Sequence, residues 1–494
     1  MLNLIAISIF SMIFANPTNY NLDLISVIEY QNDNNNYGIS DVWGYTDQTG
    51  IEYAIVGYLD GTSIVDVSSD NSPIEIMSIP GPSNGDYYYH RDYKTYQGYL
   101  YIVNEMYGGD VGMQVVDLNP LPFSDPVVLD TYSEVAQSHN LWIDPSGYAF
   151  IEHYSGDNVH IANITNPMEP IFEASFGNMA ANCHDVYTKD GIAYISEGWS
   201  NRFGIYDIDN MDNIIELASI SVPGGYAHNA WLSDEGTHLV TTEETVDRTI
   251  KIWNIEDLNN IFLEGEYIGE NLLAHNVHIK DDRVYISHYS VGIKIIDIFN
   301  PSDPIEIAAY DTYPQGNGSG YVGCWGAFPF TGNNYVYASD MQNGLYIFNF
   351  DDIYAGWVEG EIYYSIDVPA SNVSIKSILN EKEFFTNNNG QFYFGFPEGL
   401  HDFEVTYNGD ILDTISINFL PHEISNQIFL LDQIQGDVNG DNQLNILDVI
   451  VIVNHVIGAI ELSEMQQNIG DVNGDADINI QDIIILVSII IAGN

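Results

Sequence analysis

The sequence predicts a mainly β protein: a seven-bladed β-propeller, then a small β-sandwich, then a small α-helical calcium module. Three observations predict this order. A short motif recurs seven times within residues 20–352, short strands alternate with turns in residues 356–432, and one calcium-loop pattern occurs twice within residues 435–494. A chain of 494 residues is long enough for several such domains.

The charge balance is strongly acidic, with 11 Lys+Arg against 70 Asp+Glu and a formal net charge of -59. That balance excludes nonspecific binding to nucleic acid or to anionic membranes as a main task, because both need a basic surface. The content of 45% hydrophobic and 13% aromatic residues supports buried cores and excludes a wholly disordered chain.

The N-terminal residues 1–15 form an apolar run that is followed by the polar segment 16–19. We interpret this run as the signal peptide of a secreted, extracellular or surface-attached protein. It is too short to span a bilayer comfortably, and no later segment is expected to cross one.

The seven-fold repeat is centred on a histidine or tryptophan that returns every 44–50 residues. A second mark, an Asp or Asn that closes a β-rich run, returns with a similar period. Repeats of this length with about four strands each are typical of a β-propeller. We expect the N-terminal run 22–30 to complete the last blade and close the ring. The first marks are Trp43, His90, His139, His184, His228, His275 and Trp325, and the second are Asp66, Asp117, Asn163, Asp207, Asn254, Asp297 and Asn349.

This region resembles the secreted LVIVD-repeat, or choice-of-anchor B, family. The resemblance rests on the His-Asn and His-Asp motifs, on Trp325-Gly326, and on the blade closing at residues 292–304. It implies a shared propeller with a variable C-terminal anchor, and it implies no particular activity. We expect Cys183 and Cys324 to be buried and unpaired, because they fall on blades far apart in the ring.

Residues 356–432 resemble a carboxypeptidase-regulatory-like β-sandwich through the Thr386-x-x-x-Gly390-x-Phe392 hairpin. The resemblance implies a rigid spacer, and we assign no site there.

The C-terminal repeat supplies oxygen ligands at positions 1, 3, 5, 9 and 12 of each loop and a backbone carbonyl at position 7, as a hard cation requires. Each loop runs into an apolar segment, 446–457 or 480–491, that predicts a helix. Position 6, usually glycine, is Asn442 or Ala476. The predicted calcium ligands are Asp437, Asn439, Asp441, Gln443, Asn445 and Asp448, then Asp471, Asn473, Asp475, Asp477, Asn479 and Asp482.

This tail resembles a type I dockerin, down to the Gly-Asp-Val-Asn-Gly-Asp opening of both loops. The resemblance implies two EF-hand-like calcium ions and a cohesin-type partner on a scaffold or cell surface. Positions 10 and 11, often Ser/Thr in dockerins, are Ile446-Leu447 and Ile480-Gln481. Calcium is therefore better supported by the residues than a particular cohesin.

In the propeller, five histidines share one repeat position and are expected to surround the central channel, with polar groups 13–15 residues later beside them. Such a mouth could hold a transition metal, a sugar or a polyanion. Because the position repeats, hydrogen bonding between blades is the favoured interpretation, and His153, His278 and His288 break the pattern. The predicted set is His90, His139, His184, His228, His275, Glu105, Glu152, His153, Glu197, Glu243, His288 and Asp340.

No nucleophile elbow, phosphate loop, zincin motif or dinucleotide fingerprint occurs, so we assign no catalytic residue. The favoured hypothesis is a secreted binding or display protein with an unknown extracellular ligand and a calcium-dependent anchor. The alternative is a polysaccharide-degrading enzyme, a glycoside hydrolase or lyase, because dockerins mostly occur on proteins that degrade glycans. A structural surface protein without a small ligand is the third hypothesis.

Overall fold

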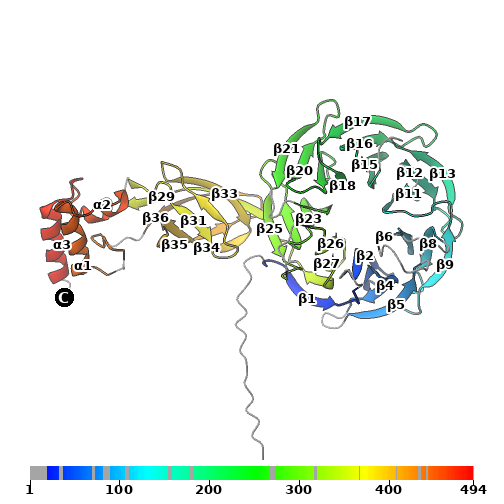
Figure 1. Ribbon diagram of the computed structural model, residues 1–494, viewed down its shortest axis with the longest axis horizontal. Helices are drawn as coiled ribbons and strands as arrows, with labels where there is room; N and C mark the ends of the chain where they lie inside the picture. The colour runs from blue at the N-terminus through cyan, green and yellow to red at the C-terminus, as the bar shows by residue number, and fades with distance from the viewer. Residues whose placement is uncertain are drawn as a thin grey trace, which may run out of the picture. The chain divides into compact units, whose positions relative to one another are not determined.

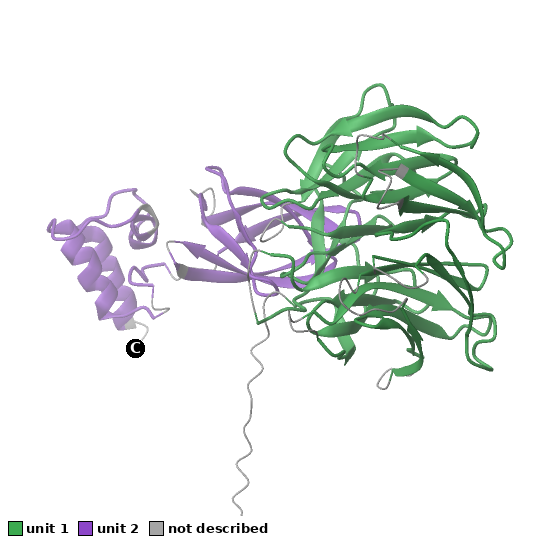
Figure 2. Cartoon of the chain, turned by 45° about the vertical axis from the view of Figure 1, so that its right-hand side comes forward, with its two compact units in different colours: residues 1–355 green, residues 356–494 purple. Residues whose placement is uncertain are grey.

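The computed structural model describes residues 19–32, 37–68, 73–81, 90–105, 111–153, 158–177, 183–267, 273–315, 320–365, 368–407, 409–431, 435–440 and 443–492. The expected signal peptide, residues 1–15, lies outside the described residues. The chain divides into two compact units, Met1–Ala355 and Gly356–Asn494 (Figure 2).

The first unit is a ring of seven four-stranded antiparallel sheets, which confirms the predicted fold class (Figure 1). Their innermost strands β2, β6, β10, β14, β18, β22 and β26 contact one another in sequence, and β26 contacts β2, so the ring is closed. The first four sheets comprise β2 (Ile39–Thr46), β3 (Glu52–Tyr58), β4 (Gly61–Asp66), β5 (Ile74–Pro80); β6 (Arg91–Tyr96), β7 (Tyr99–Asn104), β8 (Met113–Asp117), β9 (Val127–Tyr132); β10 (Leu141–Ile143), β11 (Tyr148–His153), β12 (Asn158–Asn163), β13 (Ile171–Phe176); β14 (Asp185–Lys189), β15 (Ile192–Ser196), β16 (Arg202–Asp207) and β17 (Ile215–Ser221). The last three comprise β18 (Ala227–Leu232), β19 (His238–Glu243), β20 (Ile250–Asn254), β21 (Phe262–Tyr267); β22 (Asn276–Lys280), β23 (Arg283–Ser287), β24 (Ile293–Asp297), β25 (Ile305–Tyr310); β1 (Asp23–Ile28), β26 (Cys324–Phe328), β27 (Tyr335–Asp340) and β28 (Gly344–Asn349).

The last blade is completed from the N-terminus, as predicted. Strand β1 pairs antiparallel with β28, from Asp23 opposite Asn349 to Ile28 opposite Leu345. This pairing covers the outer edge of the last sheet, which would otherwise present unpaired backbone groups.

Inner blade strands are apolar on both faces because each sheet packs between two others. Every residue of β3 except Tyr58 is buried, whereas the outer strand β13 exposes most of its residues. Side chains from neighbouring blades share one core, in which Phe203 of β16, Ile252 of β20 and Ile286 of β23 are fully buried. The free cysteines Cys183 and Cys324 are also buried.

The second repeat mark forms a turn at the end of the third strand of the blades. The carboxylate of Asp66 accepts the N–H of Ser68 at 2.8 Å, and Asp297 accepts that of Phe299 at 2.8 Å. Asn163 and Asn254 accept the N–H two residues on in the same way. The repeat therefore marks a side chain that replaces a backbone partner in a tight turn.

The second unit begins with two sheets that enclose a phenylalanine-rich core. One contains β29 (Ala355–Ser365), β30 (Val368–Pro369), β33 (Gln391–Pro397) and β36 (Ile424–Leu430). The other contains β31 (Ser374–Ser377), β32 (Glu383–Phe385), β34 (Gly399–Tyr407) and β35 (Asp410–Phe419). Phe394, Phe396, Phe403 and Phe419 are buried between them.

The chain ends in three helices, α1 (Ile446–Val456), α2 (Glu464–Gly470) and α3 (Ile480–Ala492). Helices α1 and α3 follow the two calcium-loop sequences as predicted, and α2 is an additional short helix. Ile452 of α1 and Leu486 of α3 are fully buried in a shared core. In the part of the chain that the structure describes, none of the helices combines the length and apolarity needed to cross a bilayer.

Candidate metal and ligand sites

Five histidines and one tryptophan form a closed circle of aromatic rings around the propeller axis. The circle comprises His90, His139, His184, His228, His275 and Trp325. The centroids of successive rings lie 4.1, 4.5, 4.1, 4.5, 4.3 and 5.3 Å apart. Each residue lies within two residues of the start of the innermost strand of its blade, so the fold brings one side chain from each of six blades to the same level. We call this set the histidine ring.

Most members of the histidine ring donate a hydrogen bond to the backbone of the next blade. His90 Nε2 donates to the carbonyl of His139 at 2.8 Å, His184 Nδ1 to that of His228 at 3.2 Å, and His228 Nδ1 to that of His275 at 3.0 Å. His275 Nδ1 donates to the carbonyl of Trp325. Because a carbonyl only accepts, each bond fixes which ring nitrogen carries the proton. These contacts are the hydrogen bonds between blades that the repeat favoured.

Burial keeps four of these histidines neutral. It lowers the pKa of His90 and of His275 to about 3, and it lowers the pKa of His184 and His228 well below the ordinary value. The second ring nitrogen of each therefore carries a lone pair at neutral pH. Within the described residues, His90 Nδ1 and His275 Nε2 are buried without a hydrogen-bond partner. The ring thus presents nitrogen acceptors that the propeller itself does not use.

His139 is the charged member of the ring. Burial alone would lower its pKa, but the contact of its Nδ1 with the Glu105 carboxylate raises the pKa to about 9. Burial opposes ionisation of Glu105 as well, and His139 overcomes it and lowers the pKa of that carboxyl. Glu152 accepts the backbone N–H of His139 at 2.8 Å, and burial raises the pKa of Glu152 to about 7. Two carboxyl groups beside one imidazole thus differ in ionisation.

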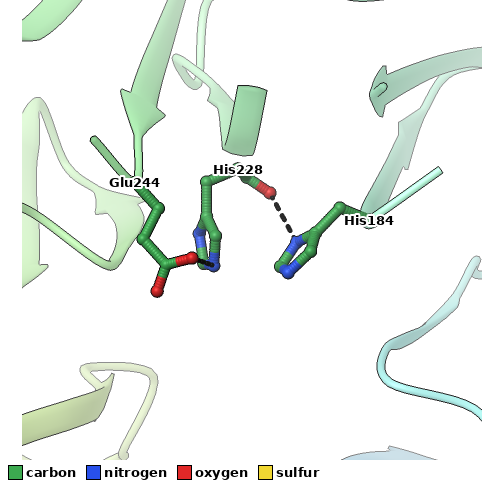
Figure 3. Close-up of side chains that lie close together, drawn as sticks. All are labelled: His184, His228 and Glu244. Atoms are coloured by element: carbon green, nitrogen blue, oxygen red, sulfur yellow. Dashed lines mark hydrogen bonds and ion pairs between the residues drawn. The ribbon is translucent and has the colours of Figure 1, made fainter. Parts of the chain in front are cut away.

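A second cluster combines two ring histidines with a carboxylate (Figure 3). One ligand atom each from His184, His228 and Glu244 lie within 4.8 Å of one another. His228 Nε2 lies 3.6 Å from Glu244 Oε2, and the Tyr289 hydroxyl donates to Glu244 Oε1. Burial raises the pKa of Glu244. Two imidazoles and a carboxylate are a donor set for a divalent transition metal.

The predicted set contains Glu243 of this blade, and in the structure it is the next residue, Glu244, that lies beside His228. Glu243 forms ion pairs with Lys251 and, at 3.8 Å, with Arg248. Glu243 is the last residue of β19 and Glu244 follows it directly, so the two side chains point in different directions. The sequence contains both acids, but it does not show which of the two side chains faces the histidine ring.

Several other predicted site residues are held by partners of their own. Glu197 pairs with Arg202 at 2.7 Å, and Asp340 accepts the Thr312 hydroxyl at 2.7 Å while burial raises its pKa to about 6. Burial lowers the pKa of His288 to about 4. The side chain of His153 lies outside the described residues.

A second aromatic layer lies next to the histidine ring and contains one of the predicted repeat marks. Trp43 does not join the ring; it packs on Phe328 at 4.8 Å and on His278 at 6.3 Å between ring centroids. Trp231 contacts His278 at 4.6 Å and Trp142 at 5.1 Å. These positions follow the ring residues by three, so Trp43 matches Trp142 and Trp231 rather than the ring histidines. His278 is therefore an aromatic core residue.

Both C-terminal loops are organised around their first and last acids in the same way. In the first loop, Asp448 is fully buried and accepts the N–H of Asn439 at 3.1 Å and of Asn445 at 2.9 Å. In the second, Asp482 is fully buried and accepts the N–H of Asn473 at 3.3 Å and of Asn479 at 2.9 Å.

The first acids of the loops also accept backbone N–H groups. Asp437 accepts the N–H of Gly440 at 3.0 Å, and Asp471 accepts those of Gly474 at 2.8 Å and Ala476 at 2.7 Å. Asp441 lies outside the described residues. The described carboxylate and amide oxygens fit a hard cation such as calcium. Ala476 has a φ of 68°, the backbone conformation for which glycine is usual at this position.

Comparison with known proteins finds one family model that matches the C-terminal residues. The model of the dockerin type I domain matches residues 435–490. None of the curated proteins matches the chain. Among solved structures, the WD40 repeats of RRP9 align at a TM-score of 0.50 with 10% identity, covering 66% of this chain and 97% of that one. The computationally designed Ika8 protein aligns at a TM-score of 0.45 with 11% identity, covering 66% of this chain and 99% of that one. The RRP9 likeness supports the propeller fold alone.

Proposed function

We propose that this chain is a secreted display protein, whose tail attaches it with calcium to a cohesin-type scaffold or surface and whose propeller binds an extracellular ligand. The observation that carries the proposal is the dockerin type I match at residues 435–490. The repeated arrangement of the buried acids Asp448 and Asp482 supports two calcium sites, one in each loop.

The domain division that we propose follows the sequence. Residues 1–15 are a signal peptide, 20–352 an LVIVD-type propeller, 356–432 a carboxypeptidase-regulatory-like spacer, and 435–494 the calcium module. In this arrangement the propeller is the recognition domain, and its histidine ring, which takes up a ligand or a transition metal, is the recognition site.

Aromatic side chains beside the histidine ring support a ligand with flat apolar faces, such as a glycan. Trp199 is 76% exposed and its ring lies 4.8 Å from that of Tyr226, which in turn lies 5.2 Å from that of His184. Tyr321 is 53% exposed and packs on Tyr289 at 5.5 Å. Exposed aromatic faces stack on sugar rings, and the neighbouring carboxylates accept hydroxyl hydrogens.

Two binding measurements on the full chain test this function. Immobilised type I cohesin should retain the chain in calcium and release it in EGTA, because bound calcium stabilises the loops that precede α1 and α3. A glycan array should show binding that Trp199→Ala weakens. Trp253→Ala, a change in β20, the third strand of the next blade, should leave that binding intact. Retention that is independent of calcium would contradict the anchor, and an array without any bound glycan would contradict the glycan ligand.

A second function, polysaccharide cleavage, is favoured by the pair Glu105 and Glu152. One carboxyl is ionised and the other has a pKa of about 7, which is the division of roles between a base and a general acid. Release of new reducing or unsaturated ends by the wild-type chain and its loss in Glu152→Gln would establish the enzyme. Binding without new ends would leave the display function alone.

A further inference from the structure

We infer that His184, His228 and Glu244 form a binding site for one divalent transition-metal ion in the propeller, separate from the calcium loops. This inference deepens the proposed function, because it assigns the chemical group through which the histidine ring would hold a ligand. It rests on the position of three ligand atoms within 4.8 Å of one another (Figure 3).

The two imidazoles are oriented and given the correct tautomer by the backbone. Each donates from Nδ1 to the next blade, His184 to the carbonyl of His228 and His228 to that of His275. The Nε2 atoms therefore carry the lone pairs. A carbonyl that holds the far nitrogen of a metal-binding histidine is the usual way to fix its ring and raise its basicity.

The carboxylate is oriented from its other oxygen. Tyr289 donates its hydroxyl to Glu244 Oε1, which leaves Oε2 on the side of His228, 3.6 Å from Nε2. That distance is longer than a hydrogen bond. The lone pair of a neutral imidazole and a carboxylate oxygen that face each other repel each other. A cation between the two atoms would turn this repulsion into two coordination bonds.

The surrounding charge favours a cation at this point. Glu244 is largely buried, and its ion-pair contact among the described residues is with His228 at 3.6 Å. The nearby positive charge, on His139, is compensated by direct contact with Glu105. An ionised carboxylate in such an environment is costly without a partner. A bound divalent ion supplies that partner.

The donor set also indicates the kind of metal. Two imidazole nitrogens and one carboxylate suit Zn²⁺, Fe²⁺, Co²⁺ or Ni²⁺, whereas calcium prefers six to eight oxygens. Three protein ligands leave coordination positions open for water or for ligand oxygens. Trp199 lies near His184 through Tyr226, and Tyr321 lies near Glu244 through Tyr289, so a metal-bound ligand would also meet aromatic faces.

Titration of the full chain with Co²⁺ in excess calcium tests the site, because calcium fills the oxygen-rich loops and cobalt bound to nitrogen absorbs in the visible range. The wild-type chain should bind one Co²⁺ that calcium does not displace. Glu244→Gln keeps the size of the side chain and an oxygen for Tyr289, and it should weaken cobalt binding at least about tenfold. Glu264→Gln is the matched control, because Glu264 pairs with His238 at 3.0 Å in the same blade but away from the ring.

The inference is overturned if the wild-type chain binds no cobalt in calcium, or if Glu244→Gln binds cobalt as tightly as Glu264→Gln does. Unfolding midpoints of both variants without cobalt show whether they fold alike, and a folded wild-type chain without a cobalt spectrum overturns the inference whatever the variants do. Cohesin and glycan binding are measured on the same preparations. Cohesin and glycan binding without cobalt binding would support the proposed function and refute the metal site. Cobalt binding without cohesin or glycan binding would support the metal site and refute the proposed function.

Discussion

Replacing Asp448 with alanine separates the structural role of the last acid in the first calcium loop from its role as a metal ligand. Its carboxylate is fully buried and accepts two backbone N–H groups, from Asn439 and Asn445. The contact with Asn445 is half of the capping box at the start of α1. The variant therefore loses loop contacts even before calcium is considered.

The magnitude follows from those contacts. A hydrogen bond to a charged group contributes about 1.5–3 kcal/mol, so two of them give a loss of at least about 3 kcal/mol without calcium. Calcium at a hundred times its dissociation constant adds about 2.7 kcal/mol per site to the wild type, and the variant should lose that gain in the first loop.

Hydrogen exchange of the α1 backbone amides, measured in the full chain, reports both the loss of the hydrogen bonds and the loss of calcium stabilisation. Without calcium, Asp448→Ala should exchange roughly a hundredfold faster than the wild type, since each 1.4 kcal/mol is a factor of ten. Calcium should slow α1 in the wild type and not in the variant. Glu461→Ala, which removes one exposed acid between α1 and α2, is the control for net charge. Unchanged protection and an unchanged calcium response in Asp448→Ala would refute the assignment of both roles.

Three further changes test the tail and the propeller. Ala476→Gly should stabilise the second loop by about 1 kcal/mol, because Ala476 holds a φ of 68°, and slower exchange in α3 would show it whereas faster exchange would contradict it. Glu152 has a folded pKa of about 7, above its ordinary 4.5, so its contribution to stability is present below pH 4.5 and is lost as the pH rises through 7. Glu152→Gln should therefore raise the free energy of unfolding, measured by urea denaturation, by up to about 3 kcal/mol at pH 8 and should change it little at pH 4. An equal effect at both pH values would contradict the buried carboxyl. Phe348→Ala removes a fully buried ring from β28, beside the closing strand β1, and should lower the free energy of unfolding by about 3–5 kcal/mol in urea denaturation, where an unchanged midpoint would show that the closing blade does not limit stability.

The fold could be predicted because its evidence is local and repeated. Six blades place a histidine or tryptophan near the start of the inner strand, and every blade ends its third strand on an Asp or Asn, as at His184 and Asp207. The periods of these marks therefore count the blades. The second marks are explained by a hydrogen bond between residues two apart in the sequence. This contact lies within one blade and does not depend on the neighbouring blades. The calcium loops are contiguous in sequence for the same reason, and α1 and α3 follow them as expected.

The propeller site could be predicted only as a set of candidates. A repeat shows which residue types share a level of the ring, and His184 and His228 do lie in contact there. It could not separate Glu243 from Glu244, because one residue along a strand end reverses the direction of a side chain. It also grouped Trp43 with the histidines, although Trp43 lies in the next aromatic layer.

The amino-acid sequence by itself thus determined the order of the domains, the closed ring of blades and the loops that resemble calcium sites, since all of these depend on contacts between near neighbours or on strict repetition. Only the tertiary structure decided which nitrogen of each histidine is free and which acid faces it. Those choices depend on carbonyl groups of the next blade, 44 and 47 residues away for His184 and His228. Hydrogen bonds between distant segments are set by how the blades pack, and no local pattern encodes them.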